Sequence, residues 1–90
     1  MSMRFPAFNE NGRKEKISDG LYRVVDDGHI GFADETGVVV IMPRYRYAYP
    51  FKNGKAKVTY RGEKVKDGTG KTHWESDEWF YIDKMGGRLD

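Results

Sequence analysis

The chain has 90 residues and a net charge of +2; 38% of the residues are hydrophobic, 33% are charged, and none is cysteine. This length allows one small domain, whose core we expect to rest on a few bulky rings drawn from five Phe, six Tyr and two Trp. The absence of cysteine excludes disulfides, and no apolar run approaches the roughly 18 residues of a membrane span. The first residues lack the apolar core of a signal peptide.

Short apolar stretches between glycine-containing turns predict five strands, at residues 21–25, 29–34, 38–42, 56–60 and 79–83. Asp27-Gly28 and Asn53-Gly54 are typical of tight hairpin turns. Residues 38–42 are the most apolar stretch, and we expect Pro43 to end that strand. Ala56, Val58 and Tyr60 alternate with polar residues and are expected on one face. The pattern predicts an antiparallel meander or stacked hairpins.

Three segments are less clearly patterned. Residues 71–85 contain neither Gly nor Pro, so Ser76-Asp77-Glu78 could cap a short helix, although the following aromatic residues favour a strand. Residues 62–70 are polar and rich in glycine and are expected to form a loop. Residues 1–19 are expected to be partly ordered.

An internal repeat is visible in the sequence. Residues 31–37 (GFADETG) align with residues 80–86 (FYIDKMG), and residues 20–24 align with residues 54–58. The first pair is offset by 49 residues and the second by 34, which places an insertion of 15 residues between them, at about residues 62–78. Residues 6–12 resemble a third, degraded copy, with Asn9 in the place of Asp34.

The order of these residues resembles the WG β-repeat. That repeat has a glycine–aromatic–hydrophobic–Asp–x–x–Gly segment, then an apolar strand with Pro and Tyr, a Phe, and a G-x-A-x-V strand. In this chain the corresponding residues are Gly31 to Gly37, Pro43, Tyr45, Phe51 and Gly54 to Val58. The resemblance implies an all-β fold of degenerate repeats over residues 20–90, a polar inserted loop, a bacterial origin and no catalytic residues. The Trp-Gly pair of the family is Ile30-Gly31 in one copy and Trp79-Phe80 in the other.

Two Asp-x-x-Gly segments are predicted to be structural turns. Asp34 precedes Gly37, and Asp83 precedes Gly86. At this spacing the carboxylate can accept from backbone N–H groups of the turn while the glycine takes a positive φ. Trp79 and Tyr81 align with Ile30 and Phe32, so we expect both in the core.

Catalytic and cofactor sites are not supported by the sequence. Residues 66–72 (KDGTGKT) imitate the end of a P-loop, but Val65 replaces the first glycine and no strand–helix context is predicted. With no cysteine and with His29 and His73 far apart, the chain lacks a zinc pattern, and no local arrangement activates a nucleophile. We therefore expect a non-enzymatic protein without cofactor or metal.

Basic residues are concentrated in one section. Residues 44–71 contain nine Lys or Arg against Glu63 and Asp67, a net charge of +7, whereas the flanking sections are net acidic. Tyr and Phe alternate with these cations, a mixture that occurs in nucleic-acid binding proteins and equally on the solvent face of strands.

The sequence therefore predicts a non-catalytic module that binds another protein. Binding of a nucleic acid or glycan by residues 44–74 is the alternative, and self-association through an edge strand is possible. Because insertions in repeat proteins often form the binding surface, the expected binding residues are Lys64, Lys66, Lys71, His73 and Trp74. We expect a cytoplasmic protein or one exported by a leader peptide that precedes this sequence.

Overall fold

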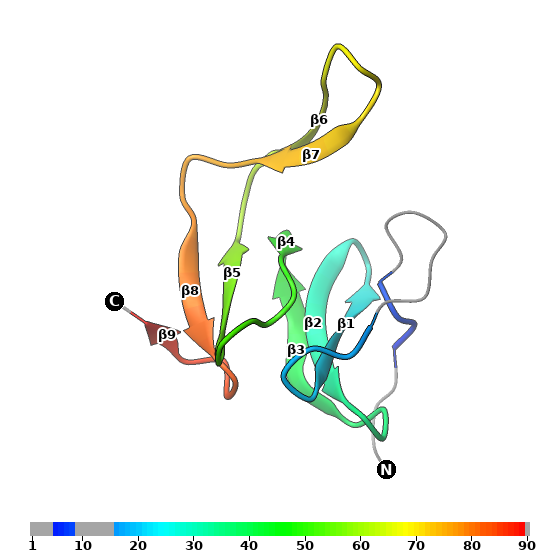
Figure 1. Ribbon diagram of the computed structural model, residues 1–90, viewed down its shortest axis with the longest axis vertical. Helices are drawn as coiled ribbons and strands as arrows, with labels where there is room; N and C mark the ends of the chain where they lie inside the picture. The colour runs from blue at the N-terminus through cyan, green and yellow to red at the C-terminus, as the bar shows by residue number, and fades with distance from the viewer. Residues whose placement is uncertain (1–4, 9–15, 90) are drawn as a thin grey trace.

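The computed structural model describes residues 5–8 and 16–89, and over these residues the chain forms nine strands and no helix. The strands are β1 (Leu21–Asp26), β2 (His29–Asp34), β3 (Val39–Tyr45), β4 (Tyr47–Ala48), β5 (Lys55–Thr59), β6 (Glu63–Lys66), β7 (Thr72–Glu75), β8 (Phe80–Asp83) and β9 (Arg88–Leu89). They form antiparallel sheets in the orders β1-β2-β3, β4-β5-β8-β9 and β6-β7. The first two sheets lie side by side, and the β6–β7 hairpin stands away from them at one end (Figure 1). The predicted all-β, antiparallel architecture is confirmed.

The first sheet starts with the hairpin predicted at Asp27-Gly28. These two residues have φ values of 49° and 75°, as a two-residue type I′ turn requires. The turn sets the register of β1 against β2, from Asp26 opposite His29 to Leu21 opposite Asp34. Strand β2 is buried on both faces except at its ends.

Strand β3 passes through Pro43, so the prediction that this proline ends the strand is wrong. The register of β3 against β2 shifts between the Ile30–Tyr45 and Phe32–Ile41 pairs, and Pro43 lies at this irregularity without a ladder partner, so its missing N–H removes no ladder hydrogen bond. Gly31 of β2 lies against the same point, and a Cβ atom there would be 2.5 Å from the Pro43 nitrogen. The absent side chain of Gly31 therefore lets the two backbones approach.

Strands β3 and β4 are two parts of one stretch of chain that changes sheets at Arg46. Tyr45, the last residue of β3, pairs with Ile30 of β2, whereas Tyr47, the first residue of β4, pairs with Thr59 of β5. The Arg46 N–H donates to the Thr59 carbonyl at 2.9 Å. Both sheets therefore share one stretch of backbone, and their buried faces form one core.

The two copies of the repeat have the same strand register. Leu21 lies opposite Asp34 in the β1–β2 pair, and Lys55 lies opposite Asp83 in the β5–β8 pair. These partners are related by the offsets of 34 and 49 residues seen in the sequence. The turns before β1 and β5 also match, because each has two residues of positive φ: Asp19-Gly20 and Asn53-Gly54. The repeat seen in the sequence is therefore also present in the structure.

The N-terminal segment forms the outer edge of the first copy. Ala7 bridges Val24 of β1 as Ala48 of β4 pairs with Val58 of β5. Ala7 therefore occupies the position that Ala48 has in the second copy. The alignment of residues 6–12 with residues 31–37 had placed it in a strand equivalent to β2, and that prediction is wrong for Ala7. The remainder of that predicted copy, Asn9 included, lies outside the described residues.

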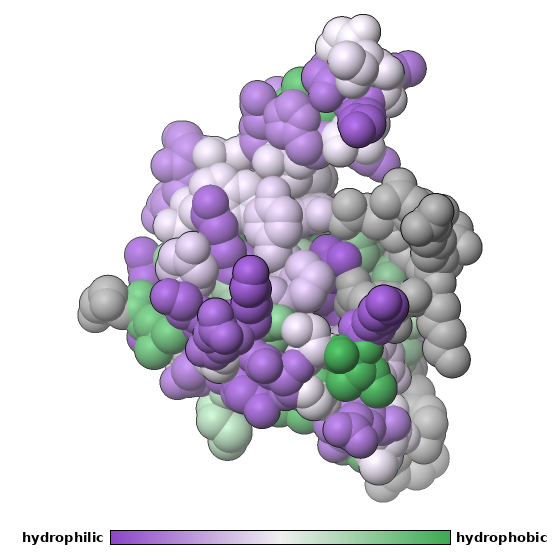
Figure 2. Space-filling view, viewed as in Figure 1, coloured by the Kyte–Doolittle hydropathy of each residue, from purple (hydrophilic) through white to green (hydrophobic). Residues whose placement is uncertain are grey.

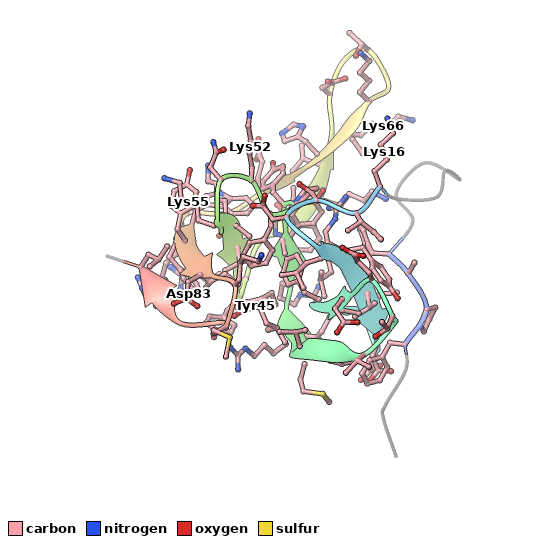
Figure 3. The ribbon with its side chains drawn as sticks, turned by 60° about the horizontal axis from the view of Figure 1, so that its bottom comes forward. Lys16, Tyr45, Lys52, Lys55, Lys66 and Asp83 are labelled. Atoms are coloured by element: carbon pink, nitrogen blue, oxygen red, sulfur yellow. The ribbon has the colours of Figure 1, made fainter. Side chains whose placement is uncertain are left out.

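The core is built from a few large side chains of both sheets. The largest that are fully buried are Tyr45, Phe32, Phe51, Ile30, Ile82, Val24, Val58 and Thr59. The rings of Phe32 and Phe51 meet edge to face at 4.6 Å. Figure 3 shows Tyr45 in the interior, whereas Lys52 and Lys55 project outward. Burial raises the pKa of Tyr45, whose hydroxyl accepts from the Arg44 guanidinium at 3.1 Å.

Two aromatic residues of the last predicted strand are not in the core. Tyr81 is 42% exposed and Trp79 is only half-buried, whereas Phe80 and Ile82 are buried. Strand β8 has one buried face, so its side chains alternate, while the equivalent strand β2 is covered on both faces. A similar correction applies to Tyr60, which lies beyond the end of β5 and is 55% exposed, although Ala56 and Val58 are buried as predicted.

Replacing Gly31 by alanine should destabilise the fold. The new methyl group would collide with the backbone of Ile41 and Pro43, and overpacking of this kind costs about 1–3 kcal/mol of unfolding free energy. Gly68→Ala is the matched control, because a Cβ there meets no atom within 4 Å and the change should stay within about 0.5 kcal/mol. Urea denaturation of both variants checks this, and equal midpoints would contradict it.

The Asp34 turn should make stability depend on acid pH. Its hydrogen bond from the Thr36 side chain, together with backbone N–H groups, lowers the pKa of the Asp34 carboxyl below its ordinary value of 3.8. The stabilisation is therefore complete above that value and is lost as the pH falls through the lower pKa of the folded chain. Asp34→Asn and Thr36→Val should both lose less unfolding free energy than the parent between about pH 5 and pH 2. If the unfolding free energy falls by the same amount with pH in all three proteins, the Asp34 turn is not the cause of the pH dependence.

Candidate functional site

The predicted loop at residues 62–70 is instead one arm and the turn of the β6–β7 hairpin. The two strands pair from Glu63 opposite Glu75 to Lys66 opposite Thr72. Since neighbouring residues of a strand face opposite ways, one face carries Lys64, Lys66, Thr72 and Trp74, and the other carries Glu63, Val65, His73 and Glu75. One side of the hairpin is thus basic and the other mainly acidic. Figure 2 shows it as a largely hydrophilic projection.

The tip of the hairpin is a third Asp-x-x-Gly turn. Asp67 Oδ1 accepts from the N–H groups of Thr69 and Lys71 at 2.9 and 3.1 Å, as Asp34 Oδ1 accepts from Thr36 and Val38. Gly70 has a φ of 87°, close to the 88° of Gly37 and Gly86. The hydrogen bond from the Thr69 side chain lowers the pKa of Asp67. The segment that imitates a P-loop is therefore a β-turn.

Asp83 makes the same contacts in the second copy. Its Oδ1 accepts from the N–H groups of Met85 and Gly87, each at 2.9 Å. The predicted turn residues Asp34, Gly37, Asp83 and Gly86 therefore lie in equivalent turns, and the Asp67 turn inside the insertion has the same hydrogen bonds.

Thr59 holds the base of the hairpin. Its side chain is fully buried where β5 ends, and its Oγ1 lies 2.8 Å from Ser76 Oγ, 2.9 Å from the Glu78 carbonyl and 3.1 Å from the Arg61 carbonyl. These partners lie on the two chain segments that enter and leave the hairpin. The exposed Arg61 side chain adds ion pairs with Asp77 at 2.8 Å and Glu78 at 3.0 Å.

Trp74 lies where the hairpin contacts strand β4. Its indole N–H donates to the Arg61 carbonyl at 3.0 Å, and its ring stacks on Tyr47 of β4 with centroids 5.6 Å apart and planes at 12°. A side chain on Gly62 would collide with the Glu75 backbone and approach the Trp74 nitrogen to 2.5 Å. The absence of a side chain at Gly62 therefore leaves room for the Trp74 indole. Trp74 is half-buried, so part of this predicted binding residue remains accessible.

Further rings continue the aromatic contact along β4. Tyr47 meets Phe8 at 6.1 Å and Tyr49 at 5.2 Å, and Trp79 lies 5.5 Å from Tyr49. Cations lie over three of the rings: Arg23 over Phe8 at 4.8 Å, Arg46 over Trp74 at 5.6 Å and Lys57 over Trp79 at 5.1 Å. Part of the basic, aromatic section of the sequence is thereby gathered on one side of the molecule.

A cleft lies between the hairpin and the first sheet, with a volume of about 170 Å³; we call it the Trp74 cleft. Its walls are mainly apolar and its polar groups are mainly cationic: Phe8, Val25, Gly28, Ile30, Arg46, Tyr47, Lys64, Thr72, His73 and Trp74. The other side of Trp74 is a shallow, open depression that contains Glu63, Glu75 and Asp77. Because the depression encloses little, the cleft is the better candidate site.

Only part of the predicted binding set lines the cleft. Lys64, His73 and Trp74 do so, whereas Lys66 and Lys71 lie at the tip of the hairpin, beside the Asp67 turn. His73 also approaches Glu75, with Nε2 and Oε1 3.0 Å apart. The sequence did not indicate the opposite wall of the cleft, which is formed by residues distant in the chain: Phe8, Val25, Ile30, Arg46 and Tyr47. Of these, Arg46 and Tyr47 belong to the basic, aromatic section at residues 44–71, which was the signal in the sequence for this side of the cleft.

The described residues contain neither a metal-binding cluster nor a membrane-spanning helix. Residues 5–8 and 16–89 contain no group of three or more His, Cys, Asp or Glu side chains arranged to hold a metal ion. In the same residues there is no helix with the length and hydrophobicity needed to cross a membrane.

Removing the Thr59 hydroxyl should loosen the hairpin. Thr59→Val leaves partly exposed polar partners without their hydrogen bond, which should cost about 1 kcal/mol of unfolding free energy. The loss should coincide with faster amide exchange in β6 and β7. Thr72→Val on the exposed hairpin surface is the control and should change stability by no more than about 0.5 kcal/mol. Unchanged exchange rates in Thr59→Val would show that other contacts hold the hairpin.

Comparison with known proteins supports the sequence resemblance. Residues 30–63 match the family model described as WG containing repeat. No curated protein and no solved structure shows a significant match to the chain. The matched residues run from Ile30 in β2 to Glu63, where the hairpin begins. Residues 30–63 therefore resemble one WG repeat, and this matched copy consists of β2, β3, β4 and β5.

Proposed function

We propose that this chain is a non-catalytic binding module and that it holds a segment of another protein in the Trp74 cleft. The observation that carries the proposal is the cleft itself, in which apolar walls from four parts of the chain meet a cationic rim. Binding sites commonly combine an apolar enclosure with a few orienting polar groups.

The shape of the cleft is maintained by contacts within the chain. Thr59 and Gly62 hold the base of the hairpin, and the stacked pair of Tyr47 and Trp74 holds its inner face. A wall that is already ordered loses little conformational entropy when a partner binds. Half-buried aromatic side chains next to an arginine are also the residue types that contribute most to protein interfaces.

A non-catalytic role fits the chemistry of the walls. Aliphatic and aromatic side chains and two cations suit a binding surface. The carboxyls whose pKa is lowered, Asp34 and Asp67, accept hydrogen bonds within their turns. Those shifts have a structural cause, so they do not indicate proton transfer.

Binding of a nucleic acid or another polyanion is the second candidate. It is favoured by the cations that lie over Trp74 and Trp79, since single strands are bound by stacked rings next to Lys and Arg. The carboxylates of Glu63, Glu75 and Asp77 on the far side of Trp74 weigh against it, because a continuous phosphate chain would have to pass them. Binding of single-stranded DNA that weakens steeply with salt would favour this candidate.

The proposal predicts that peptides selected for binding to the chain depend on Trp74. Random peptides displayed on phage would be selected on the parent protein, and the affinities of the selected peptides measured by fluorescence anisotropy. Trp74→Ala should weaken binding about tenfold or more, as expected of an interface hot spot. Val25→Phe, which narrows the cleft and leaves Trp74 in place, should weaken it as well.

Tyr81→Ala is the matched control. Tyr81 is an exposed aromatic residue that lies beside Lys55 and away from the cleft, so its loss should leave peptide affinity unchanged. Peptides that bind Trp74→Ala and Val25→Phe as tightly as the parent would refute the proposed site.

A further inference from the structure

We infer that the Trp74 cleft binds an acidic peptide segment, in which a bulky apolar side chain enters the cleft and a neighbouring Asp or Glu pairs with Arg46 and Lys64. This inference rests on the proposed function and adds the chemistry of the partner. It follows from the size of the cleft, the placement of its two cations and the distribution of carboxylates around it.

The volume of the cleft suits one large side chain. A cavity of about 150 Å³ lined by aliphatic and aromatic residues binds a molecule the size of benzene. The Trp74 cleft has about 170 Å³ and comparable walls in Val25, Ile30 and Tyr47. A Leu, Met or Phe side chain of a partner would therefore fill it and bury its apolar surface.

Arg46 is oriented for a carboxylate at the cleft mouth. Its guanidinium lies over the Trp74 ring at 5.6 Å, and its Nη1 would be 3.7 Å from a Cβ on Gly28, at the turn between β1 and β2. The side chain thus spans the cleft from that turn to the hairpin. A guanidinium next to an aromatic ring can still use its in-plane N–H groups, whose geometry matches a carboxylate.

Lys64 supplies a second positive charge on the hairpin side. It pairs with Trp74 across the β6–β7 ladder, so its side chain leaves the same face as the indole. Both charged side chains that line the cleft among the described residues are cations. A partner carboxylate would therefore meet Arg46 on one side and Lys64 on the other.

The distribution of charge favours a peptide over a nucleic acid. The cationic rim is local, because Glu63, Glu75 and Asp77 lie just beyond Trp74. A phosphodiester chain carries a charge at every nucleotide and needs a continuous basic track. A peptide can place one or two carboxylates at the rim and neutral residues beyond it.

The test compares the amino-acid composition of peptides that bind the parent chain and its charge variants. Random peptides are selected separately on the parent, Arg46→Glu, Lys64→Glu and Lys55→Glu. The last is the charge-matched control, since Lys55 lies over Tyr81 and away from the cleft. The parent and Lys55→Glu should enrich Asp or Glu next to an apolar residue by about fivefold, the size of effect expected from one exposed ion pair.

Selection on Arg46→Glu or Lys64→Glu should lose that acidic preference or reverse it to Lys and Arg, while the apolar residue is still selected. Peptides that require Trp74 but show no acidic preference would overturn this inference and leave the proposed function standing. Peptides that bind independently of Trp74 would overturn both. Displacement of the peptides by single-stranded oligodeoxythymidine, with affinity that falls steeply as salt rises, would overturn the inference in favour of a polyanion.

Discussion

One stretch of backbone, from Val39 to Ala48, belongs to both main sheets and determines how they sit together. It pairs with β2 up to Tyr45 and with β5 from Tyr47 onward. Since both sets of ladder hydrogen bonds must be made by the same strand, the sheets cannot move apart without breaking one of them. The fully buried ring of Tyr45 lies at this junction. Arg46 and Tyr47, which follow it, therefore have fixed positions at the boundary between the sheets, where the cleft forms.

The hairpin depends on the same junction. Thr59, the residue opposite Tyr47, is also the residue whose hydroxyl contacts Ser76 and the Glu78 carbonyl at the base of the hairpin. The hairpin is thus attached to β5, the strand that pairs with β4, and the Trp74 ring stacks on Tyr47. The Asp67 turn at its tip repeats the hydrogen bonds of Asp34 and Asp83. The insertion is consequently a further strand–turn–strand unit of the kind from which the rest of the chain is built.

Local patterns predicted most of the strands and turns. The Asp27-Gly28 and Asn53-Gly54 pairs specify their turns through the positive φ that such residues tolerate, and the alternation of Ala56 and Val58 specifies the buried face of β5. Failures occurred where the outcome depended on a neighbouring strand. Pro43 is tolerated because it lies at an irregularity in the pairing of β2 with β3, and Tyr81 is exposed because β8 is covered on one face only. Neither condition is visible in a window of a few residues.

By itself the sequence determined the match of residues 30–63 to the WG repeat, the all-β class, the repeat with its offsets of 34 and 49 residues, and the section from which the hairpin arises. These are properties of residue order, because turn chemistry and strand periodicity act over short distances. Only the tertiary structure decided which predicted binding residues meet. It brought Lys64, His73 and Trp74 against Phe8, Val25 and Ile30 and left Lys66 and Lys71 at the tip. The physical reason is that both walls of the cleft are set by the pairing of strands far apart in the chain.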